Sequence, residues 1–81
     1  MKKEYSKLLN ALKLDKSGDW DAAHRIVQNI ESKEASLVHA YLHRKEGDLS
    51  NARYWYNRAG ANEFIGKLED EWKDLFNLIN I

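Results

Sequence analysis

The spacing of apolar residues along this 81-residue chain predicts helices over almost its whole length. Apolar residues that recur every three or four positions form one stripe along a helix. Such stripes occupy five segments: about 3–16, 20–31, 33–46, 49–59 and 63–79. The last has the clearest amphipathic pattern, formed by Ile65, Leu68, Trp72, Leu75, Phe76 and Ile79. We therefore expect an all-α protein with a single domain spanning residues 1–81.

Short polar signals separate these segments. Gly18-Asp19 and Gly47-Asp48 are two copies of one signal, 29 residues apart. The glycine can take the left-handed conformation that ends a helix, and the aspartate can cap the next helix. Ser32 and Asn62 are expected to cap the third and fifth helices, and Gly60 to end the fourth.

The repeated hairpin resembles the tetratricopeptide repeat. Between Ala35 and Gly60, Ala40 lies in the middle of the first helix, and Ala52, Tyr56 and Ala59 follow the family's spacing of small, aromatic and small residues on the second. Residues 4–30 resemble a degenerate copy. The period of 29 is shorter than the family's 34. The stretch 39–60 also resembles short bacterial proteins of unknown function, which implies no activity.

The resemblance implies a right-handed α-α superhelix of two short hairpins, with repeat one at about 4–31, repeat two at about 33–60 and a capping helix at about 62–79. It also implies a groove lined by the first helices, in which a peptide or helix would bind. Tyr and Arg are frequent binding anchors, so Tyr54 and Arg58 on the fourth helix extend this surface. The expected partner-binding residues are Leu37, Tyr41, Arg44, Lys45, Tyr54 and Arg58. The alternative is that the N-terminal helix or a second subunit fills the groove.

His39 and His43 lie four positions apart, so both project from one face of a helix and could hold a metal ion. By register, His24 and Glu46 are the nearby candidates for a third ligand. We expect instead that both histidines lie between the third and fourth helices, hydrogen-bonded to Tyr56, Tyr54 or a backbone carbonyl. No metal or cofactor is therefore expected. The alternative is a small-ligand or metal-binding module centred on His39, His43 and Tyr56.

Charge and composition narrow the partners. The 13 basic and 13 acidic residues balance, which argues against nucleic-acid binding, and no apolar run is long enough for a membrane span. The chain has no cysteine, which excludes disulfides. Residues 1–16 carry a charge of +3 and residues 63–81 a charge of −3, which leaves open a head-to-tail homodimer or two solvated helix faces.

No arrangement of residues points to catalysis, and Glu69-Asp70-Glu71 is expected to be a solvated face. The sequence thus predicts a non-enzymatic protein-protein interaction adaptor in a bacterial cytoplasm, with an unknown protein or peptide as partner.

Overall fold

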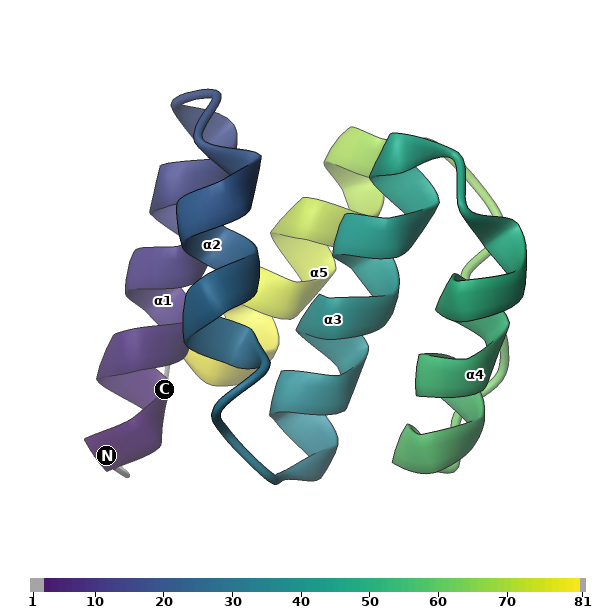
Figure 1. Ribbon diagram of the computed structural model, residues 1–81, viewed down its shortest axis with the longest axis horizontal. Coiled ribbons are helices and arrows are strands. Elements are labelled where there is room, and N and C mark those ends of the chain that lie inside the picture. Colours follow the sequence, from purple (N-terminus) through teal and green to yellow (C-terminus); the bar gives the residue numbers. More distant parts are fainter. Residues whose placement is uncertain (1–2, 81) are drawn as a thin grey trace.

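Five α-helices make up the computed structural model, which describes residues 3–80. They are α1 (Lys3–Lys16), α2 (Trp20–Val27), α3 (Lys33–Glu46), α4 (Leu49–Ala59) and α5 (Leu68–Ile79). In Figure 1, α1 to α4 stand side by side in chain order, and α5 lies behind them. There α5 packs against α1 and α3. The described residues contain no strand, so the all-α prediction is confirmed.

Most of the polar signals begin and end the helices as expected. Asp19, Ser32 and Asp48 each accept a hydrogen bond from the backbone N–H three residues later, at 3.0–3.3 Å. These side chains satisfy N–H groups that have no partner within the helix. Gly47 and Gly60 end α3 and α4 with φ of 90° and 68°, a conformation that strains residues other than glycine.

Helix α2 is shorter than predicted, because it ends at Val27 and not at residue 31. From Asn29 on, the backbone bonds run to the third preceding residue, from Asn29 to Ile26 and from Ile30 to Val27. The side-chain amide of Asn29 also donates to the carbonyl of Arg25, at 2.9 Å. These bonds tighten the last turn and compete with continuation of the helix.

The predicted start of the fifth helix was also wrong. Residues 61–67 form a non-helical connection, and α5 begins at Leu68 after Lys67, with no cap from Asn62. Gly66 has φ 139°, which interrupts a helix. Phe64 packs on a small cluster between α3 and α4, whereas Ile65, expected in the apolar stripe, is 93% exposed.

The main core lies between the row of helices and α5. Its fully buried side chains come from four helices, and the largest are Leu8, Leu12, Val27, Val38, Leu42 and Ile79. Two indole N–H groups add hydrogen bonds between helices. Trp20 donates to the carbonyl of Leu42 at 2.8 Å, and Trp72 donates to the carbonyl of Leu12 at 2.9 Å.

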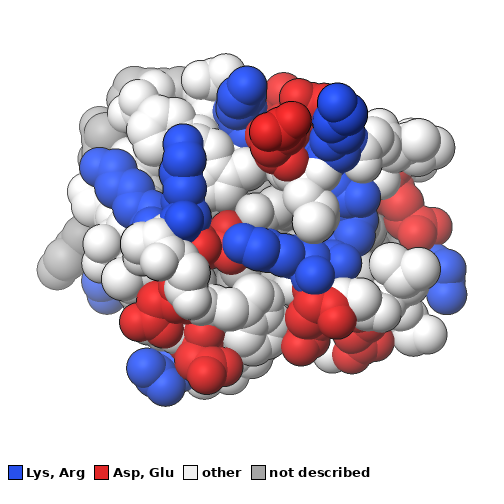
Figure 2. All heavy atoms as spheres, turned by 90° about the horizontal axis from the view of Figure 1, so that it is seen from above, with Lys and Arg blue, Asp and Glu red and all other residues white. Residues whose placement is uncertain are grey.

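The oppositely charged ends of the chain are neighbours, because α1 packs against α5. The Lys16 ammonium lies 4.5 Å from the centre of the Trp72 ring. Figure 2 shows Lys and Arg interspersed with Asp and Glu on the face seen from above. Over residues 3–80, no helix has the length and apolar character needed to span a bilayer.

Ile79→Ala tests the docking of α5. The Ile79 side chain is fully buried, so its truncation should lower the free energy of unfolding by about 2–5 kcal/mol. Leu78→Ala is the matched control, because Leu78 is 47% exposed and should cost about 0.5 kcal/mol. Urea denaturation measures both. Equal losses for the two variants would contradict the packing of α5 on the row.

Candidate functional site

All three histidines of the chain meet between α2 and α3. The Nε2 atoms of His24 and His39 lie 3.0 Å apart, and each pair of rings has its centres 4.7–5.2 Å apart. One ligand nitrogen from each ring lies within 4.8 Å of the others. His39 and His43 are buried, and His24 is partly buried. The predicted place between the third and fourth helices was wrong for His43, whose ring contacts Trp20 and His24 of α2 and His39 of its own helix. We call these three residues the histidine cluster.

A different neighbour holds each ring of the histidine cluster. Trp20 stacks on His24 with ring centres 4.9 Å apart and an angle of 8° between the planes. Trp55 of α4 stacks on His39 at 3.8 Å and 12°.

The third ring, that of His43, is held by a carboxylate. Its Nδ1 lies 2.6 Å from Oε2 of Glu46. Among the described residues, neither His39 nor His43 makes the expected hydrogen bond to Tyr56 or Tyr54. His39 contacts His24 instead, and His43 contacts Glu46.

Burial keeps two of these rings neutral. Desolvation, followed by the nearby His24, His43 and Arg58, lowers the pKa of His39 to about 3. Burial and then His43 lower the pKa of His24, against weaker opposing effects of Glu46 and Asp21. At neutral pH the contact between the two Nε2 atoms therefore joins a nitrogen that carries a hydrogen to one that does not.

The predicted peptide groove is largely covered by α5 and by interactions within the chain. Tyr41 is only 3% exposed, and its hydroxyl donates to Oδ2 of the buried Asp15 at 2.7 Å. Lys45 donates to the other oxygen of Asp15 at 2.8 Å. Leu37 is partly buried against both apolar clusters. A hollow of about 320 Å³ beside Asp15, Tyr41 and Lys45 is what remains of the groove.

Arg44, another predicted groove residue, binds α5. Its Nε donates to Oε1 of Glu71 at 2.9 Å, and its Nη1 donates to the carbonyl of Gly66 at 3.1 Å. The Tyr56 hydroxyl donates to the other oxygen of Glu71. Glu71 is 3% exposed, so its assignment to a solvated face was wrong, and so was the grouping of Tyr56 with the histidines. Burial, and then the hydrogen-bonded carboxylates, raise the pKa of Tyr41 and of Tyr56 well above its usual value.

Tyr54 and Arg58 are exposed, as predicted. Tyr54 is 52% exposed, and Arg58 donates to its hydroxyl oxygen at 3.2 Å. The Arg58 guanidinium also lies 5.2 Å from the centre of the Trp55 ring. These three side chains form one aromatic and cationic patch on α4.

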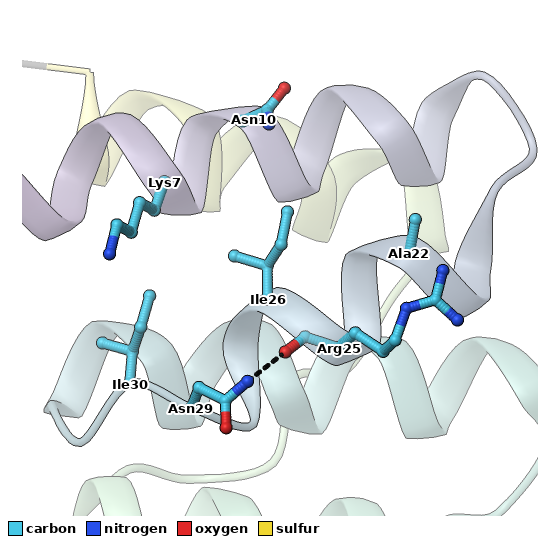
Figure 3. Close-up of a pocket in the computed structure, with 7 residues that line it drawn as sticks. All are labelled: Lys7, Asn10, Ala22, Arg25, Ile26, Asn29 and Ile30. Atoms are coloured by element: carbon cyan, nitrogen blue, oxygen red, sulfur yellow. Dashed lines mark hydrogen bonds between the residues drawn. The ribbon is translucent and has the colours of Figure 1, made fainter.

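One hollow lies along α2 and a second lies beside this patch, and neither has a lining residue from α5. The larger, of about 550 Å³, lies between α1 and α2 (Figure 3). It is lined by Lys7, Asn10, Ala22, Arg25, Ile26, Asn29 and Ile30. The second, of about 300 Å³, is lined by Gln28, Ile30, Glu31, Ser32, Lys33, Ser36, Trp55 and Arg58. Because Ile30 lines both, we call the two hollows together the Ile30 surface.

No family model, no curated protein and no solved structure matches this chain. The tetratricopeptide resemblance therefore stays a prediction, based on the spacing of Ala40, Ala52, Tyr56 and Ala59.

Sequence reasoning missed the two buried carboxylates, although their register carried a signal. Asp15 lies three residues after Leu12, on the buried stripe of α1, and Glu71 lies four residues before Leu75, on that of α5. An acidic residue in an apolar stripe indicates a buried charge with partners. Which residues are the partners depends on the tertiary arrangement.

Tyr41→Phe tests the buried hydrogen bond to Asp15. Loss of the hydroxyl leaves the carboxylate with one fewer donor, and the free energy of unfolding should fall by about 1–3 kcal/mol. Tyr54→Phe removes an exposed hydroxyl and should change it by about 0.5 kcal/mol or less. Chemical denaturation at pH 7 measures both variants, and a loss no larger for Tyr41→Phe than for Tyr54→Phe would contradict this interaction.

The histidine cluster should make stability depend on pH. His39 binds a proton near pH 6.5 when unfolded but only near pH 3 when folded, so the unfolded state gains protons first as the pH falls. The free energy of unfolding should therefore decrease from pH 7.5 to pH 5, by up to about 1.4 kcal/mol per pH unit for one proton.

Denaturation curves in the presence of a chelator measure this slope, and His39→Phe should reduce it while retaining a ring beside Trp55. Besides burial, the groups that lower the pKa of His39 are His24 on α2, His43 on the same helix as His39, and Arg58 on α4. The same slope in wild type and in His39→Phe would show that His39 is not the source.

Proposed function

We propose that this protein is a non-enzymatic interaction module that binds an acidic, partly apolar segment of another protein on the Ile30 surface. The observation that carries the proposal is that apolar and basic side chains together line two hollows, which share Ile30. The predicted tetratricopeptide-like hairpins are in keeping with it, because helical repeats commonly present extended binding surfaces.

The apolar part of the Ile30 surface comes from three elements. Ile26 lies on α2, Ile30 lies just after it, and Trp55 lies on α4. Each is partly exposed, although each packs against one of the two apolar clusters. A partner that covers them would remove further apolar area from water, at about 25 cal/mol per Å² before the costs of association.

The charged part is mainly basic. Lys7, Arg25, Lys33 and Arg58 line the two hollows, and Glu31 is the one acidic lining residue. Complementary charge across an interface speeds association and selects against partners of the wrong sign. The surface therefore favours a segment that carries aspartate or glutamate beside its apolar side chains.

This surface replaces the predicted groove as the binding site. Tyr41, Arg44 and Lys45 already bind carboxylates within the chain, so they are not free for a partner. In this proposal Arg58 remains a partner-binding residue and Trp55 is added, whereas Tyr54 lies next to Arg58 but lines neither hollow. Trp, Tyr and Arg are the residue types enriched among binding hot spots.

Selection from a random peptide library, followed by fluorescence anisotropy with the selected peptide, tests this function. Acidic peptides with apolar residues should be enriched, and Arg58→Glu should weaken their binding by about tenfold or more, which is 1.4 kcal/mol. Raising NaCl from about 50 mM to about 300 mM should also weaken binding, because exposed charges are screened.

Arg53→Glu is the control variant. Arg53 lies on the same helix outside both hollows, and its distance of 4.0 Å from Glu63 makes only a weak, exposed ion pair. Its affinity for the peptide should remain near that of wild type. A selection with no preference for acidic peptides, or equal losses for the Arg58 and Arg53 variants, would refute the proposed surface.

A further inference from the structure

We propose that the histidine cluster binds one divalent transition-metal ion of the zinc type through an imidazole nitrogen from each of His24, His39 and His43. This proposal does not rest on the proposed peptide-binding function, because none of the three histidines lines the Ile30 surface. It replaces the expectation from sequence that no metal is bound, because the structure supplies the third ligand that His39 and His43 lacked.

The spacing of the nitrogens is close to that of a metal site. Zinc binds imidazole nitrogen at about 2.0–2.1 Å, so the nitrogens of a tetrahedral site lie roughly 3.4 Å apart. In the cluster, the Nε2 atoms of His24 and His39 are 3.0 Å apart, and all three ligand nitrogens lie within 4.8 Å of one another. Side-chain movements of roughly 1 Å would therefore bring three nitrogens around one ion.

Neighbouring residues already hold the three rings. Trp20 and Trp55 stack on His24 and His39, which limits the rotation of both rings. Glu46 binds Nδ1 of His43 at 2.6 Å, which leaves Nε2 as the ligand nitrogen of that ring. A carboxylate bound to the second nitrogen of a metal-binding histidine is a common outer-shell arrangement, and it fixes the tautomer and orientation of the ring.

The chemistry of the ligands selects the ion. Three imidazoles suit zinc, copper, nickel or cobalt, whereas calcium and magnesium prefer oxygen ligands. Three protein ligands leave the fourth position of a tetrahedral ion to water. His24 is the least buried of the three rings, so its side of the cluster is the route for the ion and for that water.

The composition of α3 gives a further reason. Ser36, His39 and His43 lie on one buried face of α3, where apolar side chains would fill the space without any requirement for hydrogen bonds. The chain has only three histidines, and all of them occupy this one place. A stack of rings with a structural role alone is the competing explanation, and metal binding separates the two.

Calorimetric titration of the chelator-treated full chain with Zn²⁺ tests the site. We expect one ion per chain and a melting temperature that rises with free Zn²⁺, since a ligand that binds the folded state stabilises it. Titration with Co²⁺ should produce the visible absorption of a tetrahedral ion. His24→Gln should abolish both, and because His24 is partly exposed this variant is the one of the three most able to fold.

Glu46→Gln provides a second test that leaves all three ligands in place. Loss of the carboxylate beside His43 should weaken Zn²⁺ binding about 10–100-fold. Glu69→Gln is its control, because Glu69 is exposed on α5, a helix that packs on α1 and α3 and supplies no residue of the cluster. Circular dichroism without metal confirms that each variant is folded.

Absence of saturable Zn²⁺ binding would overturn the proposal, as would unchanged binding in a folded His24→Gln variant. Equal affinity for Zn²⁺ in Glu46→Gln and Glu69→Gln would show that Glu46 does not support His43 as a metal ligand. These results do not test the peptide-binding proposal, because neither the three histidines nor Glu46 line the Ile30 surface.

Discussion

The buried carboxylate of Glu71 is the constraint that fixes the rest of the molecule. It accepts hydrogen bonds from Arg44 of α3 and Tyr56 of α4, so it joins α5 to the second hairpin. A buried charge that loses a partner costs about 3–5 kcal/mol, which disfavours any other register of α5. With α5 held there, it covers one face of α1 and α3. The Ile30 surface and the histidine cluster lie elsewhere on α1 to α4, where α5 contributes no residue.

The all-α class and most helix boundaries could be predicted because their causes are local. Asp19, Ser32 and Asp48 cap helices through contacts only three residues long, and such contacts can be inferred from sequence spacing. The position of α5 could not, because the partners of Glu71 lie 15 and 27 residues away. The same limit applied to the site, where the sequence placed His39 and His43 on one face and offered His24 and Glu46 as third ligands, but only the tertiary arrangement shows that His24 completes the cluster.

Trp55 links the two candidate sites. One face of its ring stacks on His39 of the histidine cluster, and the residue also lines the smaller hollow of the Ile30 surface. Arg58 contacts the same ring and lowers the pKa of His39 through its charge. A partner that covers Trp55 and Arg58 would therefore alter the surroundings of His39 without touching it, and coupling of that kind acts equally in both directions.

The hydrogen bond from Trp72 to the carbonyl of Leu12 joins residues 60 positions apart, whereas that from Trp20 to Leu42 spans 22 positions. The entropy lost in closing a loop grows only with the logarithm of its length. The longer closure therefore costs roughly 1 kcal/mol more than the shorter one. Burial of a single leucine-sized side chain offsets that difference, so this small chain can join its last helix to its first with neither a disulfide nor a long connecting helix.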